Sequence, residues 1–82
     1  MKLWKISQDK NKGWDTYDSA VVAAETESDA KMMNPGDRED IKPRPWPYIT
    51  WVDDPADVQC EYIGEAKDGT QKSVVCASFN AG

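Results

Sequence analysis

Short apolar stretches separated by polar, turn-forming residues run along the whole chain. The first covers residues 3–6, and the second covers residues 17–24, in which positions 20–24 are all apolar. A strand that is apolar at successive positions is typical of an inner strand covered on both faces. We therefore predict two strands joined by a turn over the polar residues 8–13, with the second strand in the centre of a sheet.

Signals for the start of a helix follow the second predicted strand. The Thr26 hydroxyl is placed to cap the first turn, and the acidic residues Glu27 and Asp29 suit the positive end of a helix dipole. Pro35 disfavours helical backbone angles at the residue before it, so the helix must end there. The sequence predicts one short helix over about residues 27–34.

The middle of the chain is dominated by proline and mixed charges. Four of the five prolines lie between residues 35 and 47, which predicts a stiff connector in place of a helix or an inner strand. Trp46 in this connector is expected to pack onto the core. Residues 48–52 are β-prone and compatible with an extra strand, and the Asp-Asp-Pro sequence after them predicts a turn and a short helical step.

A turn signal also separates the last two apolar stretches. Residues 67–69 read Lys-Asp-Gly, which fits a three-residue hairpin loop with the glycine in a left-handed conformation. This hairpin would place Tyr62 opposite Val74 and Cys60 opposite Cys76, with both thiols on one face. A two-residue turn would shift the register by one position and separate the thiols.

These patterns predict an α+β fold, an antiparallel sheet of four to five strands with one short helix after the second strand. A chain of 82 residues is long enough for one small core. We therefore expect residues 1–82 to form a single domain, and we expect this domain to be a monomer.

The charge balance limits the class of binding partner. Fifteen acidic and ten basic side chains give a formal net charge of −5, and a negative field repels the phosphate backbone of nucleic acids. The same field favours binding to a basic protein surface. A need for solubility alone would also explain the negative net charge. No apolar run approaches the ~20 residues that span a bilayer, and no apolar leader is present. We expect a cytoplasmic protein without direct contact to nucleic acid or membrane.

Enzymatic chemistry is disfavoured by residue types that the sequence lacks. It contains no histidine, the commonest general base and a common ligand of transition metals. Its two cysteines lack the spacing of a metal site, and in a reducing cytosol both are expected to remain thiols. The carboxylates and hydroxyls of residues 15–19 are explained by turn chemistry. We therefore expect no enzymatic activity, no metal and no cofactor.

The last predicted strand is apolar on both of its faces. Its second face carries Val75, Ala77 and Phe79. Such a strand either is central and covered twice or uses its second face to bind a partner. The chain also has four tryptophans, a residue type enriched among binding anchors, and Trp14 beside the polar turn is the one expected at the surface.

Several short elements, within residues 5–30 and 73–79, match a known family, and together these two segments span about half of the chain. They are Lys5-Ile6-Ser7, Lys10-Asn11, Gly13-Trp14-Asp15 (where the family has Gly-Tyr-Asp), Ala23-Ala24, Thr26-Glu27, Ala30, Ser73-Val74 and Ala77-Ser78. In these elements the chain resembles the small type II-C anti-CRISPR proteins, which inhibit Cas9 by occupying its HNH nuclease domain.

The resemblance implies a phage or prophage inhibitor, acting in the cytosol of a bacterial host, that covers the HNH active site and leaves guided DNA binding intact. The serine with which the family reaches the HNH catalytic residues falls on Ser78, between Ala77 and Phe79. Trp14 and Asp15 belong to the matching turn. Asp40 is the candidate for an acidic contact that the family makes from its central loop.

A second interpretation stays open beside the resemblance. A strand followed by a capped helix start specifies a stable junction in many small proteins. The chain would then be a small prophage interaction module of unrelated function.

Overall fold

A hairpin of two strands, β1 (Lys2–Ser7) and β2 (Thr16–Ala24), forms the centre of the fold. The computed structural model describes residues 1–11, 13, 15–36, 50–52 and 54–80, without the side chain of residue 80. The two strands pair in one uninterrupted antiparallel register from Lys2 opposite Ala24 to Ser7 opposite Ser19. The predicted first and second strands are thereby confirmed.

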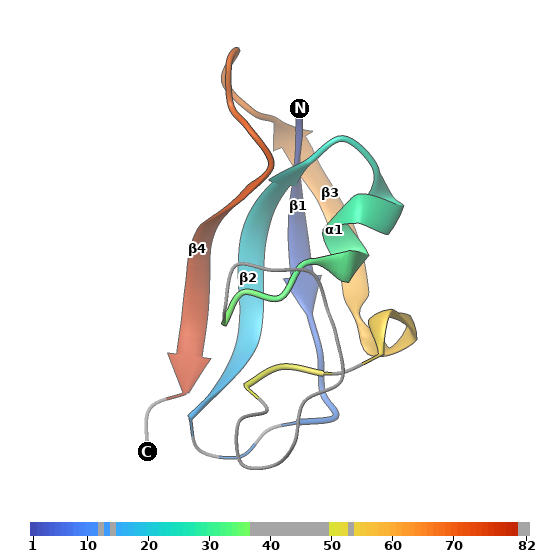
Figure 1. Ribbon diagram of the computed structural model, residues 1–82, viewed down its shortest axis with the longest axis vertical. Coiled ribbons are helices and arrows are strands. Elements are labelled where there is room, and N and C mark those ends of the chain that lie inside the picture. The colour runs from blue at the N-terminus through green and yellow to red at the C-terminus, as the bar shows by residue number, and fades with distance from the viewer. Residues whose placement is uncertain (12, 14, 37–49, 53, 81–82) are drawn as a thin grey trace.

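Two further strands flank this hairpin on opposite sides (Figure 1). Strand β3 (Gln59–Glu65) pairs with β1, and β4 (Ser73–Asn80) pairs with β2, so the sheet has the order β3-β1-β2-β4. Each pairing is antiparallel. The predicted α+β fold with one short helix after the second strand is confirmed, and β2 is an inner strand as expected.

Helix α1 (Glu27–Met32) starts where its capping residue predicts. The Thr26 hydroxyl accepts a hydrogen bond from the backbone N–H of Asp29 at 3.1 Å. The helix ends two residues earlier than expected, because Met33 already has an extended backbone with φ −76° and ψ 137°. The predicted helical step is also present as the 3-10 turn η1 (Pro55–Asp57), which Asp54 caps.

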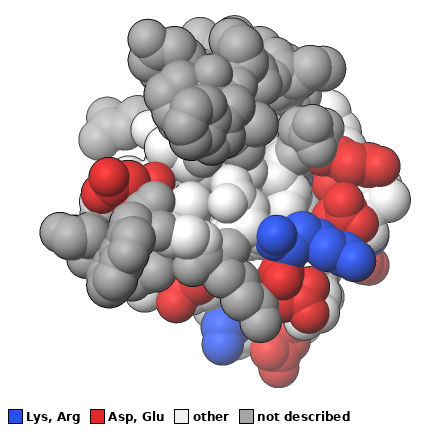
Figure 2. All heavy atoms as spheres, turned by 90° about the horizontal axis from the view of Figure 1, so that it is seen from below, with Lys and Arg blue, Asp and Glu red and all other residues white. Residues whose placement is uncertain are grey.

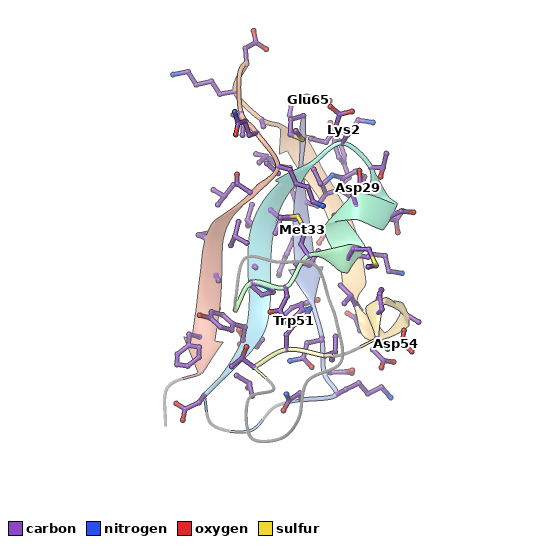
Figure 3. All side chains as sticks on the ribbon, in the orientation of Figure 1. Lys2, Asp29, Met33, Trp51, Asp54 and Glu65 are labelled. Carbon is purple, nitrogen blue, oxygen red and sulfur yellow. The ribbon has the colours of Figure 1, made fainter. Side chains whose placement is uncertain are left out.

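The core lies between α1 and the face of the sheet that the helix covers. This face is formed by the even-numbered residues of β1 and β2, among them Trp4, Ile6 and Val22. Trp51 fills the space above them with only 1% of its surface exposed, and Figure 3 shows it with Met33 on the helix side of the sheet. Residues 50–52 therefore act as a second cover beside the helix.

The other face of the sheet, here called the open face, is lined by odd-numbered residues of β1 and of β2 from Ser19 onward, because an irregularity between Tyr17 and Ser19 turns Tyr17 toward the core. In the described chain, helix α1 and residues 50–52 pack on the other side of the sheet, while Ser19 and Val21 on the open face are partly exposed and Ala23 is buried. The expectation that β2 is covered on both sides is therefore met fully on one side and only in part on the other.

The predicted hairpin of the last two strands is wrong. A turn is present, since the Thr70 N–H donates to the Lys67 carbonyl at 3.0 Å and Gly69 has a φ of 87°. The strands on either side of this turn nevertheless run to opposite edges of the sheet. Cys60 in β3 and Cys76 in β4 therefore do not face each other.

Aromatic contacts explain why each edge strand joins the central hairpin. Tyr62 of β3 packs edge-on against Trp4 with ring centroids 5.5 Å apart. Phe79 of β4 packs against Tyr17 with centroids 4.8 Å apart. Such pairs add about 0.5–1.5 kcal/mol beyond area burial, and a β3–β4 hairpin would forgo both.

Two expectations concern the middle of the chain. The first is an extra strand at residues 48–52. Residues 50–52 do not pair as a strand, and residues 48 and 49 lie outside the described residues. The expected packing of Trp46 also falls outside them.

Thiol reactivity tests the strand order directly. We expect iodoacetamide to label Cys76 faster than Cys60 in the folded protein, because Cys76 is exposed and Cys60 is partly buried. Burial also raises the pKa of the Cys60 thiol, Glu27 adds to this rise and Lys31 opposes it, which lowers the thiolate fraction that reacts. Mass spectrometry of the alkylated peptides measures both rates. An intramolecular disulfide joining the two residues would contradict the observed arrangement.

Candidate functional site

One end of the sheet, here called the lower end as in Figure 1, brings together parts of the chain that are distant in sequence. Ser7 pairs with Gln59, which places the end of β1 and the start of β3 here. Thr16 pairs with Asn80, which adds the start of β2 and the end of β4. The β1–β2 turn and η1 lie here too. The lower end is the candidate functional site.

Acidic side chains gather around the lower end. In the described part of the chain it carries Asp9, Asp15 and Asp18 from the β1–β2 turn and the start of β2, Asp54 and Asp57 from η1, and the basic Lys10. Figure 2 shows this end from below, with acidic side chains on two sides of it. Among the described residues of the lower end acidic side chains therefore outnumber basic ones, which favours approach to a basic surface.

An exposed aromatic ring lies on the β4 side of the lower end, opposite Tyr17, which Asp15 and Asp18 flank along the chain. Phe79 has 46% of its surface exposed, whereas its partner Tyr17 is half-buried and packs against the core. Ser78 precedes Phe79 and points to the open face, because successive residues of a strand alternate between faces. Its hydroxyl lies opposite Ser19 in register and is exposed. An apolar anchor and a hydroxyl thus occupy the same strand end.

A buried glutamine holds the turn that carries part of this site. Gln8 is 5% exposed. Its side-chain oxygen accepts hydrogen bonds from the N–H groups of Lys10 at 2.9 Å and Asn11 at 2.7 Å, and its amide nitrogen donates to the carbonyls of Asn11 at 2.7 Å and Tyr17 at 2.8 Å. Every donor and acceptor of the Gln8 amide group is used, so the turn is fixed at several points.

The same turn is tied to the cover formed by residues 50–52. The Asn11 side chain donates to the Trp51 carbonyl at 3.1 Å, and the Tyr17 N–H donates to the Thr50 carbonyl at 2.8 Å. Asp15 has a φ of 61°, a left-handed conformation that aspartate adopts more readily than most residues. The two hydrogen bonds to Thr50 and Trp51 thus connect the lower end to the core.

A shallow groove runs along the open face beside β4. It has a volume of about 200 Å³ and is lined by Lys5, Ser19, Ala20, Val21, Cys76, Ala77 and Ser78. Small side chains form most of its walls. The groove is therefore better suited to side chains of a partner protein than to a small molecule.

The structure brings several of the predicted site residues together. Ala77, Ser78 and Phe79 lie in the last part of β4, and Asp15 lies in the turn at the same end. Trp14 and Asp40 lie outside the described residues. Among the strands of the described chain β4 lies at an edge of the sheet, so the alternative that it is central and covered twice is wrong.

Sequence reasoning missed two contributors to this site. Gln8 belongs to a polar turn in the sequence, and nothing in its neighbours indicates that it is buried. Tyr17 begins a predicted strand, but its contact with Phe79 follows only from pairing β2 with β4 in place of the predicted hairpin.

The described residues contain no group of three side chains that could hold a metal ion. Within the same part of the chain, no helix has the length and apolar character needed to cross a membrane. Comparisons with protein-family models, curated proteins and solved structures found no match to the chain. The site must therefore be interpreted from its own geometry and from the sequence.

Replacing Gln8 by alanine is expected to destabilise the protein by at least about 1–3 kcal/mol, because buried groups of the turn lose their hydrogen-bond partners. Urea unfolding followed by tryptophan fluorescence measures the change. Gln71→Ala is the matched control, since Gln71 is exposed, and it should have almost no effect. Equal stability of the two variants would show that the Gln8 hydrogen bonds do not hold the turn.

Proposed function

We propose that the protein is a non-enzymatic inhibitor that binds a basic nuclease domain through its lower end. The observation that carries this proposal is the exposed Phe79 ring and the Ser78 hydroxyl at the same end of the sheet as a group of carboxylates, of which Asp15 and Asp18 are the nearest in register. Binding centres commonly combine a desolvated aromatic anchor with a few polar groups. Acidic surroundings add electrostatic steering toward a basic partner.

The target that we propose is the HNH nuclease domain of a type II-C Cas9. The support is the resemblance of elements within residues 5–30 and 73–79 to the anti-CRISPR proteins that bind this domain. These segments contribute the turn, β2 and β4, and so both strands of the Tyr17–Phe79 contact. A nuclease that acts on DNA needs a surface that tolerates phosphate charge, which a negative inhibitor complements.

In the proposed mechanism the inhibitor covers the HNH active site, so that target DNA is still bound but is not cut. The Ser78 hydroxyl hydrogen-bonds a catalytic group, and the Phe79 ring supplies apolar contact area. Tyr17 holds the Phe79 ring from behind and acts as a positioning residue. The inhibitor acts as a monomer in the cytosol of the bacterial host, without direct contact to nucleic acid.

Phe79→Ala is expected to weaken binding to the purified HNH domain by about 1–3 kcal/mol, the range of an interface anchor. Isothermal titration calorimetry and a DNA cleavage assay measure the effect. Ile63→Ala is the matched control, because Ile63 is exposed to 48%, nearly as much as Phe79, but lies on the opposite edge of the sheet. Similar loss in both variants would show that the lower end is not the binding site.

Ser78→Ala is expected to weaken HNH binding by about 1–2 kcal/mol, the scale of one hydrogen bond to a charged group. The melting temperature should stay nearly unchanged, because Ser78 is exposed. Ser73→Ala, at the other end of β4, is the control. A loss of stability with unchanged binding would exclude the proposed role of Ser78.

The wild-type protein decides between the two interpretations of the sequence. We expect it to block cleavage by a type II-C Cas9 while target DNA stays bound. Full cleavage at a large excess of inhibitor, across several such enzymes, would favour the small prophage interaction module of unrelated function.

A further inference from the structure

Strand β4 forms an edge of the sheet that lacks the usual protection against pairing with another chain. No strand of the described chain pairs with its outer side. Its eight residues, Ser73–Asn80, include no charged residue and no proline, the two residue types that most often block such an edge. Strand β3, on the opposite edge, carries Glu61 and Glu65.

The backbone of β4 points hydrogen-bonding groups outward at Ala77. The Gln8 N–H donates to the Asp18 carbonyl at 3.2 Å. Gln8 and Asp18 therefore form a pair whose backbone groups bond each other, and in an antiparallel ladder every second pair is of this kind. The next such pair in the uninterrupted β1–β2 register is Ile6 with Ala20, so the N–H and C=O of Ala20 face β1. Ala77 lies opposite Ala20 on the other side of β2. Its own N–H and C=O therefore point away from β2, toward the outer side of the edge.

Side chains on both faces leave room for an added strand. The alanine at position 77 is small and exposed, and the groove of about 200 Å³ on the open face reaches Cys76 and Ser78. Phe79 offers an exposed ring two residues away from Ala77. A register shift leaves Val75 without an opposite residue in β2, so the regular part of this edge is residues 76–80.

The charges beside this edge indicate what kind of segment fits. Asp18 is exposed and sits at the second register shift, between the Tyr17–Phe79 and Ser19–Ser78 pairs. Asp18 belongs to β2, one strand in from the edge, so a basic side chain of an incoming strand must extend across β4 to meet its carboxylate, and lysine and arginine are the long basic side chains that can do so. A second copy of β4 has no basic residue between Ser73 and Asn80, so it lacks this complementary charge.

We propose that β4 accepts an extended segment of a basic partner protein as a fifth strand of the sheet, paired with the backbone of Ala77 and carrying a basic residue whose side chain reaches Asp18. This inference deepens the proposed function, because it rests on a basic nuclease partner and states how that partner is held. Backbone hydrogen bonds supply affinity in such strand additions, and flanking side chains supply specificity.

Amide hydrogen exchange measured by NMR tests the proposal on the full chain. One probe is the purified HNH domain of a type II-C Cas9. The other is the synthetic peptide acetyl-Thr-Val-Thr-Val-Thr-Arg-amide at saturating concentration, with glutamate in place of arginine as its control. We expect both the domain and the arginine peptide to slow exchange of the Ala77 amide by about tenfold or more, as new pairing protects it. The glutamate peptide should bind more weakly.

A pair of variants separates strand addition from simple contact. Ala77→Pro removes the outward N–H, and proline is tolerated in an edge strand where the N–H faces solvent. Ala77→Ser changes the side chain and keeps the N–H. We expect the proline variant to bind the HNH domain about tenfold or more weakly than the serine variant, the scale of lost backbone pairing. If the proline variant does not fold, the exchange data on the wild type decide.

The outcomes are distinguishable. Binding of the HNH domain without protection of Ala77 would overturn the strand addition and leave the proposed function standing. Protection by the peptide without binding of the HNH domain would support the strand addition and exclude the HNH target. Protection that grows with protein concentration in the absence of any partner would identify a second copy as the occupant and overturn the proposal, as would failure of both probes.

Discussion

The arrangement of the lower end depends on one buried amide group. The Gln8 side chain bonds four backbone groups of the β1–β2 turn and of Tyr17, and it does so next to the core. A buried polar group that is fully paired rigidifies its surroundings, whereas a partly paired one is costly. Because Tyr17 is held here, Phe79 and the end of β4 are held as well. The geometry of the candidate site thus follows from the closure of a turn.

A second constraint is the division of the sheet into a covered and an open face. The helix and residues 50–52 cover the even-numbered side of the central hairpin, where Trp4 and Trp51 are buried. A chain of 82 residues has little further apolar material with which to build a second layer. Within the described chain no second layer is built on the open face and no strand pairs with the outer side of β4, and it is along this outer side that the added strand is proposed.

Local signals in the sequence were sufficient for the elements but not for their order. The apolar run at positions 20–24 and the Thr26 cap act over a few residues, so β2 and α1 could be predicted from neighbouring positions. The turn at residues 67–70 could also be predicted, but a turn only reverses the chain and does not choose the partner strand. That choice is made by contacts between distant residues, such as Tyr17 with Phe79. For the same reason the position of Asp15 beside β4 could not be derived from spacing alone.

The positions of the two chain ends have a practical meaning for any study of this protein. The Met1 carbonyl accepts a hydrogen bond from the Ala66 N–H at 2.9 Å, at the end of the sheet remote from the Phe79 ring, whereas β4 finishes beside that ring (Figure 1). A purification tag, fluorophore or surface linker attached before Met1 would leave the lower end accessible. The same group attached after residue 80 would start next to Phe79 and compete with a partner for space. For an immobilised assay of the candidate site, the amino terminus is therefore the better point of attachment.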